Sequence, residues 1–239
     1  AITLIIVFLT IFIIVLNHLM RKSTGLESVS DESYRDQLSK IGMSNGWNNI
    51  TKDDIKKHLI ANKDFSNQKV KDYFAGTVVN QDTLDFFRHL DGLFQDSQDL
   101  ADNLEKAHKY LYSVLPARQA SEMMDLYNKY LTMQINYHNT KKNKEIPGTP
   151  EEAIANLYKQ QEERRAIFGK ENADIIFGAG VKTDEYFIRR NAVVADGNMN
   201  GLEKERKLGI LNESMWGSTT ALFDENSTPY QRYQEKLQL

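Results

Sequence analysis

The sequence predicts an all-α fold: an N-terminal transmembrane helix, then a small helical domain, then an extended helical arm. Three observations support this prediction. Residues 1–20 form one apolar run without a charged side chain. Apolar residues recur at helical spacing through most of the remaining chain, and helix-capping patterns precede several of these stretches. We find neither the alternation typical of β-strands nor a repeat of fixed length.

The composition excludes several classes of protein. The 239 residues include 30 basic and 33 acidic side chains, with a formal net charge of −3. A mildly acidic chain without a basic block is poorly suited to hold a phosphate backbone, so we expect no nucleic-acid partner. The chain has no cysteine, which excludes disulfides, thiolate zinc sites and cysteine catalysis.

Residues 1–20 are predicted to be a membrane anchor, because a bilayer core requires about 20 mainly apolar residues. A cleaved signal peptide has a shorter apolar core of about 7–15 residues and a small-residue cleavage site, and no such site follows Met20. Arg21 and Lys22 argue for a cytoplasmic body by the positive-inside rule. The sequence starts at Ala1, so basic residues further upstream would change that balance. The flanking charges therefore leave the topology open.

Behind the anchor we expect a linker over residues 21–46 and a small helical domain over residues 47–97. Thr51-x-x-Asp54 resembles a capping box and predicts the start of one helix. Ser66 is a candidate N-cap for a second helix. A third helix begins near residue 82 and carries apolar residues at helical spacing, namely Leu84, Phe87, Leu90 and Phe94.

The arm is predicted to cover residues 98–239. Its first helix ends at Pro116, and a later helix is capped by Thr149. Further helices are predicted over residues 170–177, 183–195, 201–216 and 229–238. Narrow, aromatic apolar stripes with charged faces between them favour an extended layout, or a surface that a partner completes. The same aromatic residues could instead form an ordinary helical core, and the pattern leaves both interpretations open.

The sequence offers little for catalysis. It contains none of the common phosphate-binding, nucleophile-elbow or histidine-pair zinc motifs, so we expect no enzyme activity, cofactor or metal. Asp85 and His89 stand one helical turn apart and could form an acid–base couple, but a local hydrogen bond is the favoured interpretation. The pairs Glu162–Arg165 and Glu203–Lys207 are expected on solvated helix faces.

Three stretches together resemble the membrane-anchored lipase-specific foldases, the steric chaperones of Gram-negative secretion. Residues 84–87, Leu-Asp-Phe-Phe, with Gly92 beyond them, are similar to the family's R-x-x-F-D-Y-[FC] motif. Leu115-Pro116 and residues 124–131 are similar to its LP…ALxLxxRYL stretch. The third stretch resembles its paired FG turns, at Phe168-Gly169 and Phe177-Gly178, and its D-x-x-L-x-x-x-EK stretch, at Leu202-Glu203-Lys204.

The resemblance implies a non-catalytic chaperone whose arm wraps a secreted client enzyme. It also implies a single-pass inner-membrane anchor through residues 1–20, with the body in the periplasm, and release of the client to the type II secretion system. Asp85, Phe86 and Phe87 are then expected to form the critical client-binding patch. The expected client contacts of the arm are Tyr127, Tyr130, Phe168 and Phe177.

The sequence departs from the foldase pattern in its first motif. Gln81 replaces the arginine, Leu84 the first phenylalanine and Phe86 the tyrosine. The chain also ends at Leu239, where a lipase foldase would continue. Both points favour the short CpaB-type chaperones, which resemble this family but serve a secreted metalloprotease. A lipase-specific foldase proper and a structural scaffold subunit of an envelope complex remain as alternatives.

Overall fold

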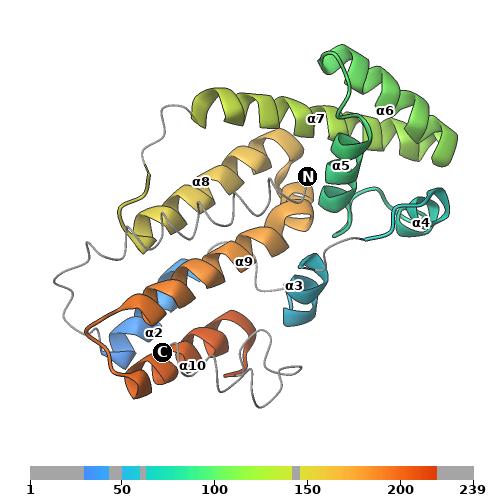
Figure 1. The fold of residues 1–239 in the computed structure, drawn as a ribbon. Coiled ribbons are helices and arrows are strands. Elements are labelled where there is room, and N and C mark those ends of the chain that lie inside the picture. Colours follow the sequence, from blue (N-terminus) through green and yellow to red (C-terminus); the bar gives the residue numbers. More distant parts are fainter. Residues whose placement is uncertain (1–29, 43–49, 60–62, 142–145, 220–239) are drawn as a thin grey trace. The chain divides into compact units, whose positions relative to one another are not determined.

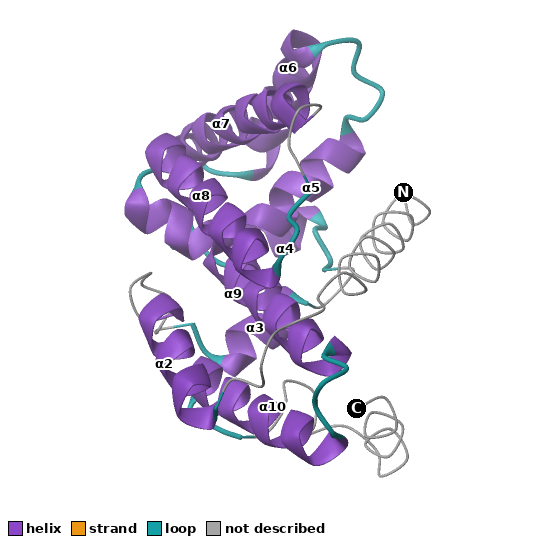
Figure 2. Cartoon of the chain, turned by 90° about the vertical axis from the view of Figure 1, so that its left-hand side faces the viewer, coloured by secondary structure: helices purple, strands orange, loops and turns teal. Residues whose placement is uncertain are grey.

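The computed structural model describes residues 30–42, 50–59, 63–141 and 146–219 (Figure 1). Every regular element in these ranges is an α-helix, without a strand, as the sequence predicts (Figure 2). The helices are α2 (Asp31–Gly42), α3 (Lys52–His58), α4 (Asn67–Tyr73), α5 (Thr83–Leu93), α6 (Leu100–Val114), α7 (Ala117–Lys141), α8 (Pro150–Phe168), α9 (Lys170–Ala195) and α10 (Gly201–Trp216).

The predicted anchor and the predicted last helix, residues 1–20 and 229–238, lie outside the described residues. Among the helices that the structure describes, none is both long and apolar enough to cross a bilayer.

Capping side chains set several of the helix starts that the sequence predicts. Thr51 and Asp54 form a reciprocal capping box at α3, since each side chain accepts a hydrogen bond from the other residue's backbone N–H. The Thr149 hydroxyl accepts from the Glu152 backbone N–H at 3.2 Å and caps α8. Ser66 occupies the N-cap position of α4, but its side chain makes no capping hydrogen bond there.

The chain forms two compact units. Of the described residues, unit 1 contains 30–42, 147–156 and 183–219. Unit 2 contains 50–59, 63–141, 146 and 157–182, so α8 and α9 contribute residues to both units.

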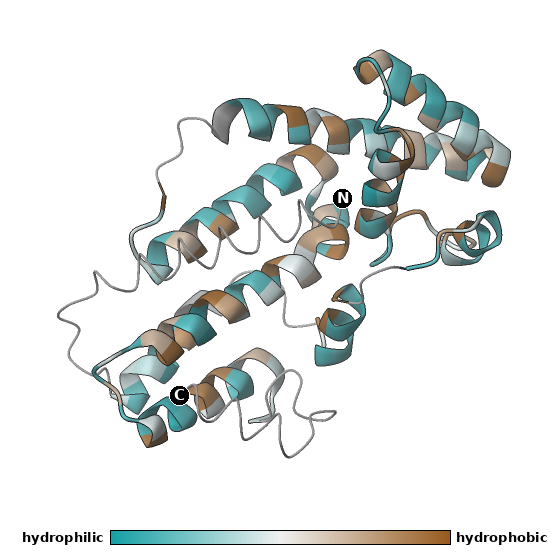
Figure 3. Ribbon diagram, in the orientation of Figure 1, coloured by the Kyte–Doolittle hydropathy of each residue, from teal (hydrophilic) through white to brown (hydrophobic). Residues whose placement is uncertain are grey.

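Unit 2 has one hydrophobic core, to which α4 to α7 and the turn between α8 and α9 contribute. Within it, α6 and α7 pack against each other, and both carry apolar and polar residues along their length (Figures 1 and 3). The core contains Phe86 and Leu90 from one side of the predicted boundary at residue 97, and Leu111 and Tyr127 from the other. The predicted boundary between a small domain and an arm therefore does not separate two cores.

In unit 1, α2 packs against α10. The predicted linker, residues 21–46, therefore differs from the structure over α2. The Ser30 side chain caps α2 by accepting from the Ser33 backbone N–H, and Asp31 lies in its first turn. Leu38 is buried, and Asp31 forms an ion pair with Arg206 at 2.6 Å. The polar composition of this segment led to the prediction of a linker, but the segment forms a capped helix with a buried apolar residue.

The helix α9 is continuous from Lys170 to Ala195, so the predicted break between residues 177 and 183 is wrong. Gly180, inside this stretch, serves helix packing instead of a turn. A Cβ atom at Gly180 would lie 3.3 Å from His58 Nε2 of α3, tighter than ordinary van der Waals contact. The absence of a side chain at Gly180 therefore lets α3 approach α9 closely.

Candidate functional site

The motif residues Phe86 and Phe87 lie on α5 and are fully buried in the core of unit 2. Phe86 packs against Phe74, with ring centroids 5.0 Å apart. Phe87 packs against Tyr130 of α7 at the same centroid distance. Adjacent residues on a helix point about 100° apart, so the two rings join α5 to two different neighbours. In this structure the two rings pack α5 against the end of α4 and against α7.

Asp85, the acidic residue of the motif, is held by two cations. Its carboxylate pairs with Lys63 Nζ at 2.8 Å and with Arg88 Nη1 at 3.1 Å. Lys63 also pairs with Asp82 at 2.7 Å, and so ties the chain before α4 to the start of α5. Burial opposes the charged form of Lys63, but hydrogen bonds to Asp82 and Asp85 outweigh it and raise its pKa.

Two departures from the foldase motif have structural roles here. The Gln81 side-chain amide donates to Asp54 Oδ1 at 2.8 Å and so connects the start of α5 to α3. Leu84 is buried among the apolar core residues.

His89 packs its ring against Phe65, with centroids 5.2 Å apart, while Asp85 binds the two cations described above. The structure therefore provides a packing role for His89 in place of the acid–base couple considered from the sequence.

Tyr127 and Tyr130 lie on α7 with buried rings, and both hydroxyls reach Asp91 near the end of α5. Tyr127 donates to Asp91 Oδ1 at 2.9 Å, and Tyr130 donates to Asp91 Oδ2 at 3.1 Å. Burial and the adjacent carboxylate raise the pKa of both hydroxyls, which keeps them protonated as donors. Burial also raises the pKa of Asp91, although the hydrogen bonds from the two tyrosines oppose this effect.

Phe168 and Phe177 meet edge to face at 5.2 Å across the turn between α8 and α9. Gly169 makes this turn with a φ of +82°, a left-handed conformation that favours glycine. The first predicted FG turn therefore exists, whereas the second, at Phe177-Gly178, lies inside α9. The Arg164 guanidinium lies 4.8 Å from the centroid of the Phe177 ring.

The six predicted aromatic contacts are thus buried within unit 2, and Asp85 is largely covered by its ion pairs. The alternative considered from the sequence, an ordinary helical core, describes the aromatic residues in this structure. Client contact through these seven residues stays a prediction. The rings could reach a client only if the core rearranged, because the free chain presents little of their surface.

Of the two charge pairs expected on solvated helix faces, Glu162–Arg165 forms, but Arg165 and the Lys207 of the second pair are largely buried. Arg165 pairs with Glu162 but is itself largely buried, because it also binds Asp174 through Nε at 2.7 Å and Nη2 at 2.9 Å. Lys207 is buried beneath the Tyr34 ring, with Nζ 5.5 Å from the ring centroid. Both cations face inward since the helix on which each lies has a neighbour on that side.

The residues of the D-x-x-L-x-x-x-EK stretch stabilise the start of α10. Glu203 forms a capping box with Asn200. Lys204 donates to the Val194 carbonyl oxygen at 2.7 Å and closes the turn between α9 and α10. In contrast, Leu202 is the most exposed of the large apolar residues in the described part of the chain. The polar residues of this stretch therefore act on the local fold.

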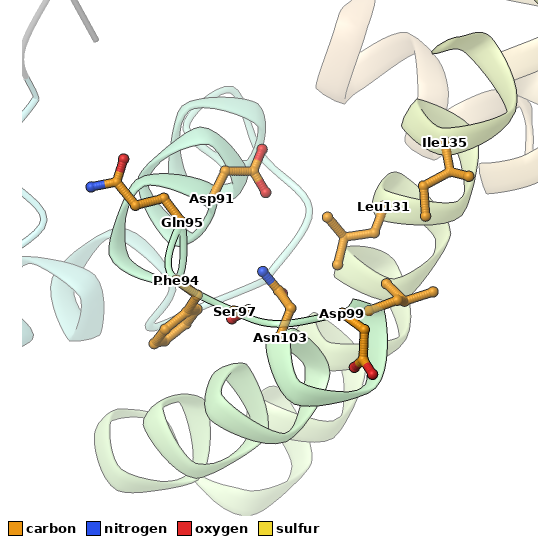
Figure 4. Close-up of a pocket in the computed structure, with 9 residues that line it drawn as sticks. Asp91, Phe94, Gln95, Ser97, Asp99, Asn103, Leu131 and Ile135 are labelled. Carbon is orange, nitrogen blue, oxygen red and sulfur yellow. The ribbon is translucent and has the colours of Figure 1, made fainter. Parts of the chain in front are cut away.

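A pocket of about 320 Å³ lies where α5, α6 and α7 meet (Figure 4). Its lining comes from the end of α5 and the segment after it, from the start of α6 and from α7: Asp91, Phe94, Gln95, Ser97, Asp99, Leu100, Asn103, Leu131 and Ile135. This site was not predicted from the sequence. One signal was present, because Asp91 follows Phe87 by one helical turn and so places a carboxylate on the apolar face of α5.

The described residues offer no cluster of three or more histidine, aspartate or glutamate side chains that could hold a metal ion. The Asp91 pocket contains carboxylate, amide and hydroxyl groups but no histidine. It presents a carboxylate fixed by two hydroxyls, beside apolar side chains that are exposed to solvent.

Residues 126–238 match a family model described as "Proteobacterial lipase chaperone protein". The match covers slightly less than half of the chain and supports a relation to the lipase chaperone family. Members of that family are folding helpers for a secreted enzyme. It includes Tyr127, Tyr130, Phe168 and Phe177, whereas the α5 motif lies before it. No curated protein and no solved structure matches the chain.

Proposed function

We propose that this chain is a membrane-tethered periplasmic steric chaperone, a foldase, for an enzyme exported by type II secretion. The observation that carries the proposal is the match of residues 126–238 to the lipase chaperone family. The α5 motif, outside that match, adds independent support from the sequence. The anchor proposed over residues 1–20 would keep the chaperone at the inner membrane and raise its local concentration around the client.

The chaperone acts thermodynamically in this proposal. It binds the folded or nearly folded client more tightly than the unfolded chain, and so shifts the client's equilibrium towards the folded form. Such binding requires apolar surface that the chaperone has not used for its own core. The buried aromatic rings of unit 2 do not provide it in the free chain. Exposed apolar residues do, and three of them lie near the end of α5 or around the pocket: Leu93, Leu100 and Ile135.

A secreted metalloprotease is the proposed client, and a lipase is the alternative. The metalloprotease is favoured by the departures at Gln81, Leu84 and Phe86 from the lipase foldase motif. The structure supports the view that these departures matter, because Gln81 bonds to Asp54 and Leu84 lies in the core. A lipase is favoured by the description of the matching family.

The test combines capture with refolding. Full-length protein is solubilised from its native envelope, and the proteins that co-purify are identified by mass. The main partner is then unfolded and diluted with or without the purified chain. We expect recovery of the partner's enzyme activity in proportion to added chain, up to a stoichiometric amount.

A matched pair of variants locates the client surface. Ile135→Gln changes an exposed residue beside the pocket and should weaken refolding, whereas Leu202→Gln, an exposed residue of α10, should not. A lipase as the main partner would replace the proposed client. Stable recovery of envelope-complex subunits alone, with no gain in enzyme activity, would contradict the chaperone and indicate a scaffold.

A further inference from the structure

The Asp91 pocket has a polar floor that is fixed in place. The Tyr127 and Tyr130 hydroxyls each donate to one oxygen of the Asp91 carboxylate. Gln134 donates to the Tyr130 hydroxyl at 3.1 Å, and Asn103 lies 3.2 Å from the Tyr127 hydroxyl. Two neutral donors thus fix the position of the carboxylate, and its remaining lone pairs can accept further hydrogen bonds.

Part of the pocket lining is apolar and exposed to solvent. Figure 4 shows Leu131 and Ile135 of α7 facing the end of α5 and the start of α6. Ile135 is 43% exposed and Leu100 is 38% exposed, values that are high for large apolar residues. The pocket therefore combines a fixed carboxylate with exposed aliphatic side chains.

The ionisable residues in the pocket lining carry one sign of charge. Asp91 and Asp99 are its ionisable lining residues, and both are acidic. Arg88, one turn before Asp91, is directed into the ion pair with Asp85. Asp99 is partly occupied as the N-cap of α6, since it accepts from the Asp102 backbone N–H at 2.9 Å. The carboxylate of Asp91 is thus the group for which a cation would be the complement.

We propose that this pocket is an anchor site for an arginine or lysine side chain of the client. Such side chains carry an aliphatic stem with a charged head, which matches apolar walls above a fixed carboxylate. A guanidinium can also donate two parallel hydrogen bonds to a carboxylate, so arginine is the better fit. The inference rests on the proposed function for the source of the side chain, but the site itself can be tested without a client.

The first experiment titrates the ¹⁵N-labelled full chain in detergent with blocked amino acids, and follows amide shifts by NMR. N-acetyl-arginine methylamide is the probe, and N-acetyl-norleucine methylamide is the uncharged comparison. We expect shifts concentrated at Asp91, Asn103 and Leu131, with binding about tenfold tighter for the arginine derivative, a factor typical of one partly buried charge pair. Equal binding of both probes, or shifts scattered over other acidic residues, would overturn the proposal.

Two variants separate charge from shape. Asp91→Asn removes the charge and should abolish the preference for arginine. Asp96→Asn is the matched control, because Asp96 lies five residues further along and its side chain is 78% exposed, outside the pocket lining. Retention of the preference in Asp91→Asn would contradict the site.

Ile135→Lys keeps the test informative if Asp91→Asn fails to fold, since Ile135 is exposed and its replacement leaves no buried group unpaired. The introduced ammonium should occupy the pocket and reduce arginine binding about tenfold. Leu202→Lys adds the same charge at an exposed residue outside the pocket lining and should bind arginine like the unaltered chain. Arginine binding that survives in Ile135→Lys would also overturn the site.

The client refolding assay then distinguishes the two proposals. If the unaltered chain restores client activity and Asp91→Asn does so equally well, the pocket does not anchor the client, and the chaperone function stands. If Asp91→Asn requires about tenfold more chain for the same recovery and Asp96→Asn does not, the anchor is supported. If the unaltered chain restores no activity, the chaperone function fails, while the probe titration still decides whether the pocket binds a cation.

Discussion

Unit 2 is held together mainly by aromatic and aliphatic side chains, whereas unit 1 buries several charged ones. In unit 2, Phe86, Phe87 and Tyr127 are fully buried and pack against other core residues. In unit 1, Glu185 and Arg189 are buried as an ion pair with Nη2 and Oε1 2.9 Å apart. The first kind of interior is stabilised by the apolar area it removes from water. The second kind depends on geometry, because a buried charge is tolerated only when its partner is in place.

This difference indicates which substitutions should destabilise each unit most. Truncating a buried aromatic ring in unit 2 should lower the stability by an amount that grows with the number of buried atoms removed. A buried charge in unit 1 loses its compensation entirely when its partner is removed, although replacing both partners can be harmless. Single and double substitutions should therefore behave differently in the two units.

The largest effect is expected from Phe87→Ala in unit 2. Removing a fully buried ring that contacts Tyr127 and Tyr130 should lower the free energy of unfolding by about 3–5 kcal/mol. Leu93→Ala is the matched control on the same helix, and its exposed side chain should cost less than about 1 kcal/mol. Urea unfolding followed by circular dichroism measures both. Similar losses for the two variants would contradict the assigned core.

The aromatic interior was the more predictable of the two, because its signal is local. Leu84, Phe87 and Leu90 recur at helical spacing, and all three are buried. Which helices share a core was not predictable, since that depends on contacts between residues far apart in the chain. The boundary expected at residue 97 was for this reason placed through the middle of one core.

The buried charges were predicted poorly, for a physical reason. Spacing along a helix shows which side chains share a face but not whether that face meets another helix. Arg165 and Lys207 were therefore expected in solvent and are largely buried. Asp91 was not predicted as a site residue for the same reason, because the position of its carboxylate depends on tyrosines 36 and 39 residues further along the chain.

The second effect, in unit 1, comes from Glu185→Leu. The change leaves the buried Arg189 guanidinium without its anion and should cost about 3 kcal/mol. The double variant Glu185→Leu/Arg189→Met replaces both charges with apolar groups of similar size and should recover most of that loss. Urea unfolding of the two variants gives the comparison. A double variant no more stable than the single one would show that the pair contributes more than mutual compensation.

The third prediction concerns a largely buried charge pair of unit 2, Arg165–Asp174. Burial alone would raise the pKa of Asp174, but hydrogen bonds from Arg165, Lys170 and Gln161 outweigh it and hold the pKa below its ordinary value. Asp174→Asn should therefore cost about 1.5–3 kcal/mol at neutral pH, the range for hydrogen bonds to charged groups.

The sign of the pH dependence follows from the lowered pKa. The native state holds the Asp174 proton less tightly than the unfolded chain does, so its stabilisation is present above the ordinary carboxyl pKa of about 4. It is lost as the pH falls through the lower native pKa. Thermal unfolding between pH 2 and 7 should thus show Asp174→Asn and the unaltered chain converging at the acid end. Asp125→Asn, whose exposed carboxylate pairs with Lys129, is the control and should differ little at any pH.

The smallest effects come from two glycines, one in each unit, and they are expected to have opposite signs. Gly169 turns the chain between α8 and α9 with a φ of +82°, and nothing lies within 4 Å of an added Cβ. Gly169→Ala should therefore cost about 1–2 kcal/mol from backbone strain alone.

Gly209 lies inside α10, also with open space around an added Cβ and without a left-handed φ. Gly209→Ala should stabilise by about 0.5–1 kcal/mol, because alanine favours the helix. Thermal unfolding of both variants at neutral pH measures the pair, and a neutral Gly169→Ala would mean that the α8–α9 turn does not require the left-handed conformation.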